Sequence, residues 1–398
     1  MNQPLPFQAR TGCPACSGEA GSLGYAISNV PANSVRIHRS ESAASSIPTG
    51  DIDLAGCLSC GFIWNTAFDP ELVEYSSDYE ATQAYSETYR RFLRAQADEL
   101  VEAYGLRNKR IVEIGCGHGE FLAEICEAGE NFGIGFDPAF SADRAPSIKR
   151  GSFEVRAEPF DANTKLPEAD FICCRNTLEH LADVGEFVSG LRAVIGESGE
   201  PLVFFQVPAW ERIAAEGAFW DIYYEHCSYF TAASLTALFE RNGFDVLSCE
   251  RSYGEQYLSL LARPARDSGR PPLACGSGFG DLIEAGHRLQ EEVKEWTTLL
   301  CDHSTGSGPT ILWGGGSKAV ALLTTCDIAD GVHGVVDINP YKQDAYLPGS
   351  GVRVMAPEAL KSVKPERVVV MNPIYVKEIR ARLAQLDVTT QVIGLGVE

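Results

Sequence analysis

The stretch RIVEIGCGHGE at residues 110–120 decides the fold. Its apolar first half, residues 110–114, predicts a short buried strand, and the glycines after it predict a tight turn where a ligand can approach bare backbone. Apolar residues over 121–127 predict a helix directly after the turn. A strand, a glycine turn and a helix in this order are typical of the first unit of a doubly wound α/β sheet.

A second predicted strand, FGIGF at residues 132–136, is followed by Asp137 and Pro138. Asp137 comes 24 residues after Glu113, a spacing that places a carboxylate where it can hold the two ribose hydroxyls of an adenosine. The dinucleotide fingerprint needs glycine or alanine where Glu120 stands. A nucleoside without phosphates therefore fits this turn better, which favours S-adenosylmethionine (SAM) as its ligand.

Strand and helix signals continue on both sides of this unit. Short apolar runs predict further strands at 170–174, 202–206, 245–250 and 256–262, and helical spacing predicts helices at 85–104, 179–194 and 232–241. A second alternating unit near the C-terminus has predicted strands at 310–313, 334–337, 367–371 and 391–395. This alternation predicts an α/β fold with a central doubly wound, Rossmann-like sheet and a C-terminal Rossmann-like lobe.

Proline, glycine and charge without periodicity predict a linker at residues 263–280, ahead of a long amphipathic helix. We therefore expect three domains. They are an N-terminal module at 1–72, a central domain at 73–265 and a C-terminal domain at 266–398. The N-terminal module is expected to be rich in loops.

Two C-x-x-C knuckles lie at the two ends of the N-terminal module, Cys13 with Cys16 and Cys57 with Cys60. Two such turns can offer four thiolates to one tetrahedral Zn²⁺. No ligand set that would hold a reactive water is visible, so the zinc is predicted to be structural, a staple for a small domain. A redox pair and simple buried thiols are the alternatives.

The composition of the 398 residues is that of an ordinary globular protein, with 45% hydrophobic and 22% charged residues. Thirty-three basic against 54 acidic residues give a net charge of −21, which argues against nucleic-acid and anionic membrane partners. No apolar run reaches the roughly 20 residues that span a bilayer, and the N-terminus lacks a secretory pattern. We expect a cytoplasmic protein, a monomer or small homo-oligomer, acting on a small molecule.

The chain resembles the class I SAM-dependent methyltransferases and, within them, the zinc-containing C-methyltransferases of nucleotide-linked keto-deoxysugars. The resemblance covers nearly the whole length. It rests on the cysteine knuckles and on seven further segments: Asp78-Tyr79, Glu113 to Gly119, Leu178-Glu179-His180, Tyr223 to Phe230, Gly314 to Lys318, Val336-Asp337 and Lys342 to Gly349.

The glycine turn and the ends of the neighbouring strands are the expected SAM site. Strand carboxyl ends are where doubly wound sheets bind their ligands. The residues assigned to the donor are Glu113, Gly115, Gly117, Gly119, Phe121, Asp137, Pro138 and Asn176. Gln206, at the end of another predicted strand, is expected to contact the acceptor substrate.

The resemblance implies carbon methylation beside a ketone. Such a reaction needs a base for the carbon-bound proton, donors for the enolate oxygen, and alignment of the carbon with the sulfonium. His226 suits the base, because imidazole is largely neutral near pH 7. Glu225 is expected to orient His226 or bind substrate, and Tyr223 and Tyr79 to donate to the oxygen. His180 is expected nearby, and purely structural roles for both histidines stay open.

The C-terminal turn GGGSKA at residues 314–319 also satisfies a dinucleotide fingerprint, since Asp337 follows Gly314 by 23 residues. The resemblance instead implies a substrate-side role. Lys318 and Lys342 would then meet the phosphates of a nucleotide-diphosphate sugar in an otherwise acidic protein. A packing turn that holds no phosphate is the alternative.

Two other functions stay open at this stage. An O- or N-methyltransferase acting on a sugar or small metabolite would use the same donor site with less need for the tyrosines. A nicotinamide-dependent oxidoreductase, or a nucleotide-binding sensor without catalysis, would use the C-terminal turn.

Overall fold

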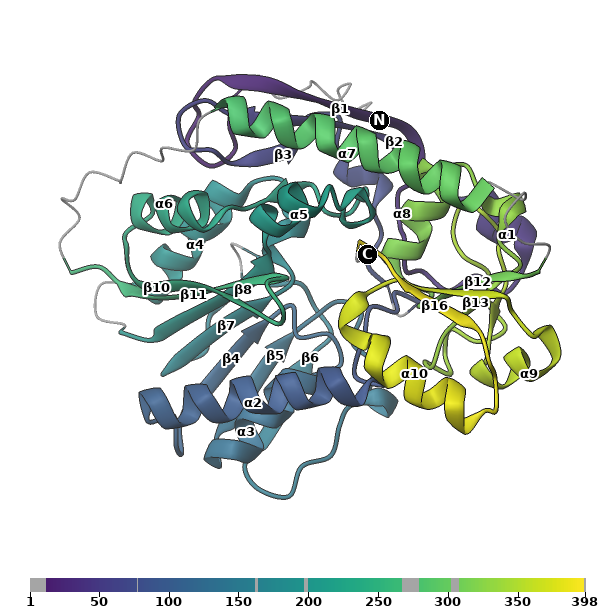
Figure 1. Cartoon of the computed structure of the whole chain (residues 1–398). Coiled ribbons are helices and arrows are strands. Elements are labelled where there is room, and N and C mark those ends of the chain that lie inside the picture. Colours follow the sequence, from purple (N-terminus) through teal and green to yellow (C-terminus); the bar gives the residue numbers. More distant parts are fainter. Residues whose placement is uncertain are drawn as a thin grey trace, which may run out of the picture.

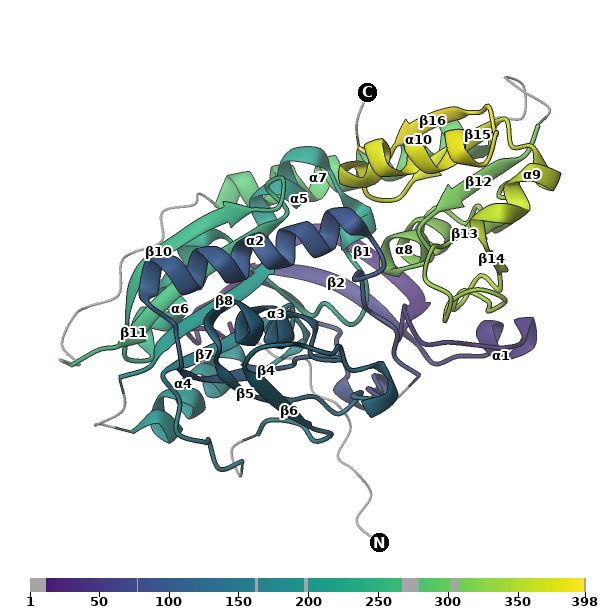
Figure 2. The same cartoon turned by 90° about the horizontal axis from the view of Figure 1, so that it is seen from below.

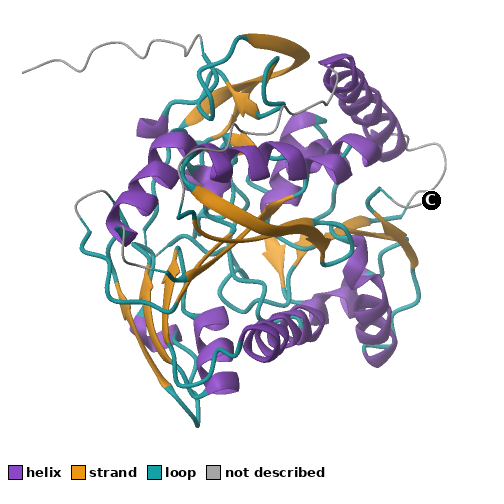
Figure 3. Ribbon diagram, turned by 90° about the vertical axis from the view of Figure 1, so that its left-hand side faces the viewer, coloured by secondary structure: helices purple, strands orange, loops and turns teal. Residues whose placement is uncertain are grey.

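The computed structural model describes residues 12–76, 78–161, 164–196, 200–266, 279–301 and 308–396. Within these residues the strands form three sheets, and helices and strands alternate through most of the chain (Figure 3). No helix in the described ranges is both long and apolar enough to cross a membrane. Most of the predicted linker, residues 267–278, lies outside the described part of the chain.

The central sheet has seven strands in the order β10-β11-β8-β7-β4-β5-β6. The five strands from β8 to β6 are parallel, while β11 is antiparallel to both β8 and β10. The strands are β4 (Arg110–Ile114), β5 (Phe132–Phe136), β6 (Ser152–Arg156), β7 (Phe171–Arg175), β8 (Leu202–Pro208), β10 (Phe244–Ser252) and β11 (Tyr257–Pro264). The strand order reverses at β4, so a ligand crevice is expected at the carboxyl end of β4.

Helices cover both faces of the central sheet. Helix α2 lies across one face together with α3, and α4 and α6 cover the other (Figures 1 and 2). A further helix, α5, follows β8. The bounds of these helices are α2 (Glu87–Tyr104), α3 (Glu120–Gly129), α4 (Val184–Ile195), α5 (Trp210–Glu216) and α6 (Ala232–Arg241).

The N-terminal module contains an antiparallel sheet in the order β1-β2-β3-β9, which the expectation of a loop-rich module did not include. Its elements are β1 (Ala20–Pro31), the short helix α1 (Glu41–Ser45), β2 (Thr49–Cys57) and β3 (Ile63–Asn65), with β9 (Ser228–Tyr229). Strand β9 comes from the chain that follows the central parallel strands. The module is therefore completed by a segment about 160 residues further along the sequence.

The C-terminal sheet has five parallel strands in the order β14-β13-β12-β15-β16, again with the reversal at its first strand. Its elements are β12 (Thr310–Trp313), α8 (Ser317–Thr325), β13 (Val335–Val336), β14 (Val354–Met355), α9 (Leu360–Val363), β15 (Arg367–Val370), α10 (Val376–Gln385) and β16 (Gln391–Gly394). The predicted fold class, a doubly wound sheet with a C-terminal Rossmann-like lobe, is confirmed.

Helix α7 (Phe279–Cys301) packs along β1 of the N-terminal module, as Figure 1 shows in green. Leu282 and Leu289 of α7 share one apolar core with Tyr25 of β1. Trp220 joins the same core and packs edge-on against Trp296 of α7, with ring centroids 6.0 Å apart. Because segments of all three predicted domains share this core, the domain boundaries stay predictions.

The predicted strands and helices agree with the structure within two residues at each end, with one exception. The predicted helix at 179–194 begins only at Val184. Leu178–His180 forms a separate 3₁₀ turn, and Leu178 and Glu179 are buried in it. This break leaves His180 beside the cavity described below, where a continuous helix would carry it away.

Replacing Trp220 by alanine should reduce the stability of the whole chain. Trp220 is fully buried where α7 meets the central and C-terminal parts, so its loss leaves a large cavity. We expect the free energy of unfolding to fall by about 3–5 kcal/mol, measured as a lower melting temperature. Phe132→Ala is the matched control, because Phe132 is 54% exposed and should leave the melting temperature almost unchanged. Equal shifts in both variants would contradict the shared core.

Candidate active site

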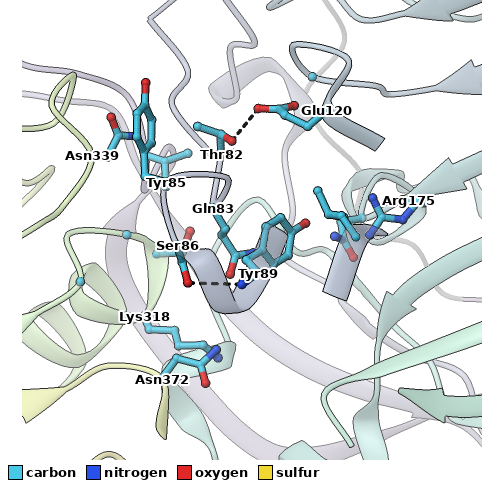
Figure 4. A pocket seen from close by; sticks show the side chains of 18 of the residues that line it. Thr82, Gln83, Tyr85, Ser86, Tyr89, Glu120, Arg175, Lys318, Asn339 and Asn372 are labelled. Carbon is cyan, nitrogen blue, oxygen red and sulfur yellow. Dashed lines mark hydrogen bonds between the residues drawn. The ribbon is translucent and has the colours of Figure 1, made fainter. Parts of the chain in front are cut away.

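A cavity of about 1150 Å³ opens at the carboxyl ends of the central strands, where they face the C-terminal lobe. Each lobe supplies part of its wall. Val35 comes from the N-terminal module, Asp137 follows β5 of the central sheet, and Lys318 lies on α8. Figure 4 shows Tyr85, which precedes α2, and Tyr89, in the first turn of α2, lining the cavity together with Lys318 and Asn372. The cavity is therefore the candidate active site.

The glycine turn after β4 has a backbone that only glycine accepts easily. Gly115, Gly117 and Gly119 all have positive φ angles, at 68°, 57° and 87°. A Cβ atom on Gly115 would lie only 2.0 Å from Oγ1 of Thr177. Gly115 and Gly117 line the cavity, whereas Gly119 caps α3 and is not among the lining residues.

Asp137 is held in place by the same turn. Its Oδ2 accepts a hydrogen bond from the Gly117 amide at 2.7 Å, and its Oδ1 accepts one from the Ala139 amide at 2.8 Å. Burial raises the pKa of Asp137, and these two donors oppose that rise. The carboxylate is thus oriented at the cavity wall, where a ribose hydroxyl can donate to it.

The rest of the predicted donor site also lines the cavity, namely Glu113, Phe121, Pro138 and Asn176. Asn176 follows β7 with a left-handed backbone, φ 50°, and its buried Oδ1 has no hydrogen-bond partner. Glu113 is buried, which raises its pKa to about 8, and its Oε2 is also without a partner. Unpaired polar atoms beside a bare glycine turn fit the adenosine and amino-acid groups of SAM.

The two predicted histidines lie beside each other in the cavity wall. Their rings lie edge to face with centroids 4.7 Å apart. His226 Nε2 is 2.9 Å from the Tyr223 hydroxyl, and His180 Nδ1 is 2.9 Å from the Tyr75 hydroxyl. Burial lowers the pKa of His226 well below its usual value and that of His180 to about 4. Both imidazoles are therefore neutral at neutral pH.

Glu179 and Tyr75 belong to this cluster, although neither was among the predicted site residues. Glu179 Oε1 lies 4.0 Å from His226 Nε2, and both carboxylate oxygens are buried without hydrogen-bond partners. Burial raises the pKa of Glu179 to about 8. Tyr75 packs against Tyr79 at 5.1 Å between ring centroids, and both line the cavity. Glu179 directly precedes the predicted site residue His180. This adjacency is the feature of the sequence that could have identified Glu179 as a site residue.

Glu225 lies outside the residues that line the cavity. Its Oε1 accepts hydrogen bonds from the Ser34 amide at 2.6 Å and the Ser34 hydroxyl at 3.0 Å. The Ser34 hydroxyl also contacts Ser317 Oγ, at 2.8 Å, at the start of α8. Burial raises the pKa of Glu225 to about 7. In this position Glu225 links the three lobes, and it makes no hydrogen bond to His226 in the described structure.

Gln206 is not placed to contact a substrate, contrary to prediction. Its side chain is fully buried and is absent from the cavity lining. Gln206 Oε1 instead accepts a hydrogen bond from Gln96 Nε2 at 2.9 Å, in the packing between β8 and α2. Strand alternation turns this side chain toward the helix that covers the sheet.

The two predicted phosphate-binding lysines both line the cavity but differ in their partners. Lys318 forms an ion pair with Asp221, which also accepts a hydrogen bond from Arg212. Burial by itself raises the pKa of Asp221, but the two cations keep it below its usual value. Lys342 is 8% exposed and forms no ion pair within 4.0 Å in the described ranges. The charge of Lys342 is therefore more available to a ligand than that of Lys318, which is paired with Asp221.

The four knuckle cysteines come together away from this cavity. Their sulfur atoms all lie within 4.8 Å of one another, with Cys13 and Cys60 at 3.6 Å and Cys16 and Cys57 at 3.4 Å. Backbone amides of Ala15 and of the second knuckle point at these sulfurs. Zn²⁺ bound tetrahedrally at 2.3 Å sets sulfur pairs about 3.8 Å apart, so this arrangement fits the ion.

Two family models match different parts of the chain. Residues 85–249 match a methyltransferase domain, and residues 286–393 match a C-methyltransferase C-terminal domain. The second model covers the lobe whose glycine turn also resembles a dinucleotide site. Its match assigns that lobe to C-methyltransferases.

Individual proteins are also similar to this chain. C-methyltransferase NovU of Streptomyces niveus is 24% identical over 352 residues, which are 82% of this chain and 81% of that protein. A magnesium protoporphyrin IX methyltransferase from Synechocystis PCC 6803, solved with bound S-adenosylhomocysteine (SAH), is 13% identical with a TM-score of 0.34, over 45% of this chain and 84% of that one. A SAM-dependent methyltransferase from Aquifex aeolicus is 14% identical with a TM-score of 0.33, over 50% and 100%.

Replacing Gly115 by alanine should weaken donor binding. The new methyl group would meet Thr177 at a position where φ is already positive, so the turn must change shape. We expect the affinity for SAH, measured by calorimetry, to fall by at least about tenfold. Gly190→Ala is the control, because a Cβ there meets no atom within 4 Å. Unchanged SAH affinity in Gly115→Ala would contradict this placement of the donor.

Proposed function

Because this chain belongs to the SAM-dependent C-methyltransferases, we propose that it methylates the carbon beside the ketone of a nucleotide-linked 4-keto-deoxysugar. SAM supplies an electrophilic methyl group when it is bound. Glu113, Gly115, Gly117, Asp137 and Asn176 would hold it against the glycine turn. The residues of this chain then have to activate the acceptor carbon.

The observation that carries the proposal is the neutral, buried imidazole of His226 beside a tyrosine hydroxyl. Nε2 of His226 lies 2.9 Å from the Tyr223 hydroxyl inside the cavity. In the tautomer with its proton on Nδ1, Nε2 accepts from that hydroxyl. A neutral imidazole with a free Nε2 can take a proton from carbon, which a protonated one cannot.

We infer that Tyr223 changes partner when the acceptor binds. Its hydroxyl would donate to the keto oxygen, and Nε2 of His226 would then be free to take the proton from the adjacent carbon. The electron pair of the C–H bond moves toward the keto oxygen and forms an enolate. Tyr79, on the same wall, supports the proposal because a second phenol can donate to that oxygen.

The C-terminal lobe is proposed to hold the nucleotide diphosphate. The turn after β12 leads into the N-terminus of α8, where helix dipoles favour anions. Lys342 is the better phosphate ligand of the two lysines, because Lys318 is already paired with Asp221. Lys318 would then keep Asp221 and Arg212 in place at the cavity wall.

We also propose that Cys13, Cys16, Cys57 and Cys60 bind a structural Zn²⁺. Four buried or partly buried thiols at tetrahedral spacing support this assignment. The metal would hold the two ends of the N-terminal module together and would take no part in the methyl transfer.

Replacing His226 by asparagine should remove the base while leaving donor binding intact. We expect kcat to fall by about 10²–10⁴, with SAH affinity unchanged. The assay uses labelled SAM and a panel of nucleotide-linked 4-keto-deoxysugars, with the position of the label found by NMR. His287→Asn, on an exposed face of α7, is the control and should keep full activity.

The same assay distinguishes the other methyl acceptors. Label on oxygen or nitrogen, together with substantial turnover by His226→Asn, would replace the carbon mechanism by O- or N-methylation. Absence of turnover on every sugar in the panel would contradict the proposed substrate class.

Replacing Cys57 by serine should release the zinc. Loss of one thiolate weakens a four-cysteine site, so the bound zinc, measured by mass spectrometry of the metal, should fall from one ion per chain toward zero. The melting temperature should fall with it. Cys301→Ser is the control, because Cys301 is exposed and distant in the sequence from both knuckles. Full zinc content in Cys57→Ser would contradict the four-thiolate site.

A further inference from the structure

Arg175 places an unpaired positive charge in the wall of the cavity. It is the last residue of β7, is 7% exposed, and lines the cavity. Its Nε and Nη2 atoms are buried without hydrogen-bond partners, and no carboxylate of the described residues lies within 4.0 Å of its nitrogens. A guanidinium stays charged at any ordinary pH, and burying it without an anion is costly. Nε and Nη2 of Arg175 are therefore available to an anionic ligand.

The neighbours of Arg175 contact the guanidinium through an aromatic ring and a tyrosine hydroxyl. Its Cζ lies 4.3 Å from the centre of the Phe121 ring, and it is a hydrogen-bonding neighbour of Tyr89. Figure 4 shows Tyr89 and Arg175 close together in the cavity wall. Glu120 accepts a hydrogen bond from the Thr82 hydroxyl at 2.6 Å. Glu113 is buried nearby, and its attraction to Arg175 opposes the rise in the pKa of Glu113 that burial causes. The described structure shows no ion pair between the two side chains within 4.0 Å, so both remain open to a ligand.

The strand order indicates which anionic group would reach Arg175. Strand β4, which carries the glycine turn, lies between β5 and β7. Asp137, the ribose ligand, follows β5, so a donor lying across the turn extends its other end toward β7 and Arg175. Two strand spacings are about 10 Å, which is the reach from a ribose to the end of a homocysteine chain. That chain ends in a carboxylate, the group that an arginine fork binds best.

We propose that Arg175 binds the α-carboxylate of the methionine part of SAM and selects for donors that carry it. The inference rests on the donor site at the Gly115 turn. It predicts that ligands with and without the amino-acid part respond differently to the loss of this arginine.

The test compares two ligands in the full chain by calorimetry. SAH carries the carboxylate, whereas 5′-methylthioadenosine has the same adenosine and sulfur without the amino acid. In Arg175→Met, which keeps an apolar stem over Phe121, SAH should bind roughly tenfold to a hundredfold more weakly. The affinity for 5′-methylthioadenosine should change less than about threefold, because this ligand lacks the carboxylate that the Arg175 guanidinium would bind. Arg175→Lys should fall between wild type and Arg175→Met for SAH.

Arg94→Met is the control, since Arg94 is an exposed arginine of α2 paired with Glu124, and it should change neither affinity. Equal losses for both ligands in Arg175→Met would overturn the proposal and make Arg175 a purely structural residue. Unchanged SAH affinity with a raised KM for the acceptor would also overturn it and assign Arg175 to the substrate. Failure of the wild type to bind either ligand would instead overturn the donor site itself.

Discussion

The buried contact between Glu225, Ser34 and Ser317 is the link on which the shape of the site depends. It joins the segment after η4 (Phe219–Asp221), the N-terminal module and the first residue of α8 within two successive hydrogen bonds. These three residues come from the three lobes that surround the cavity. Since a buried carboxylate is costly without donors, this contact favours the closed arrangement of the lobes.

Burial sets the chemistry of the cluster at His226. Burial is the largest cause of the lowered pKa of both histidines and of the raised pKa of Glu179. A neutral imidazole and an unpaired carboxyl group are therefore kept side by side.

Local patterns predicted the parallel strands and the donor turn because both depend on short stretches of sequence. Arg110–Ile114 and the glycines after it require only a buried strand and positive φ angles. The errors concern side-chain direction, which depends on distant segments. Gln206 lies near a strand end as expected, but its side chain packs under α2, where it is hydrogen-bonded to Gln96. Glu225 lies two residues after the site tyrosine Tyr223, yet its partner Ser34 is 191 residues away.

The two glycine turns of the chain show why a fingerprint alone cannot assign a ligand. Asp337 accepts from the Gly315 amide at 2.7 Å and from the Asn339 amide at 2.7 Å, the same pair of contacts that Asp137 makes after β5. Each aspartate thus closes its own turn, with or without a nucleotide. What differs is the set of polar groups left over beside the turn. Beside the first turn, Asn176 Oδ1 and the Nε and Nη2 atoms of Arg175 have no hydrogen-bond partner, which favours a polar ligand with an anionic end. The second has the lysine at 342, whose single charge suits a phosphate. The ligand of each lobe therefore follows from its unpaired groups, and the shared turn explains only why both lobes can bind one.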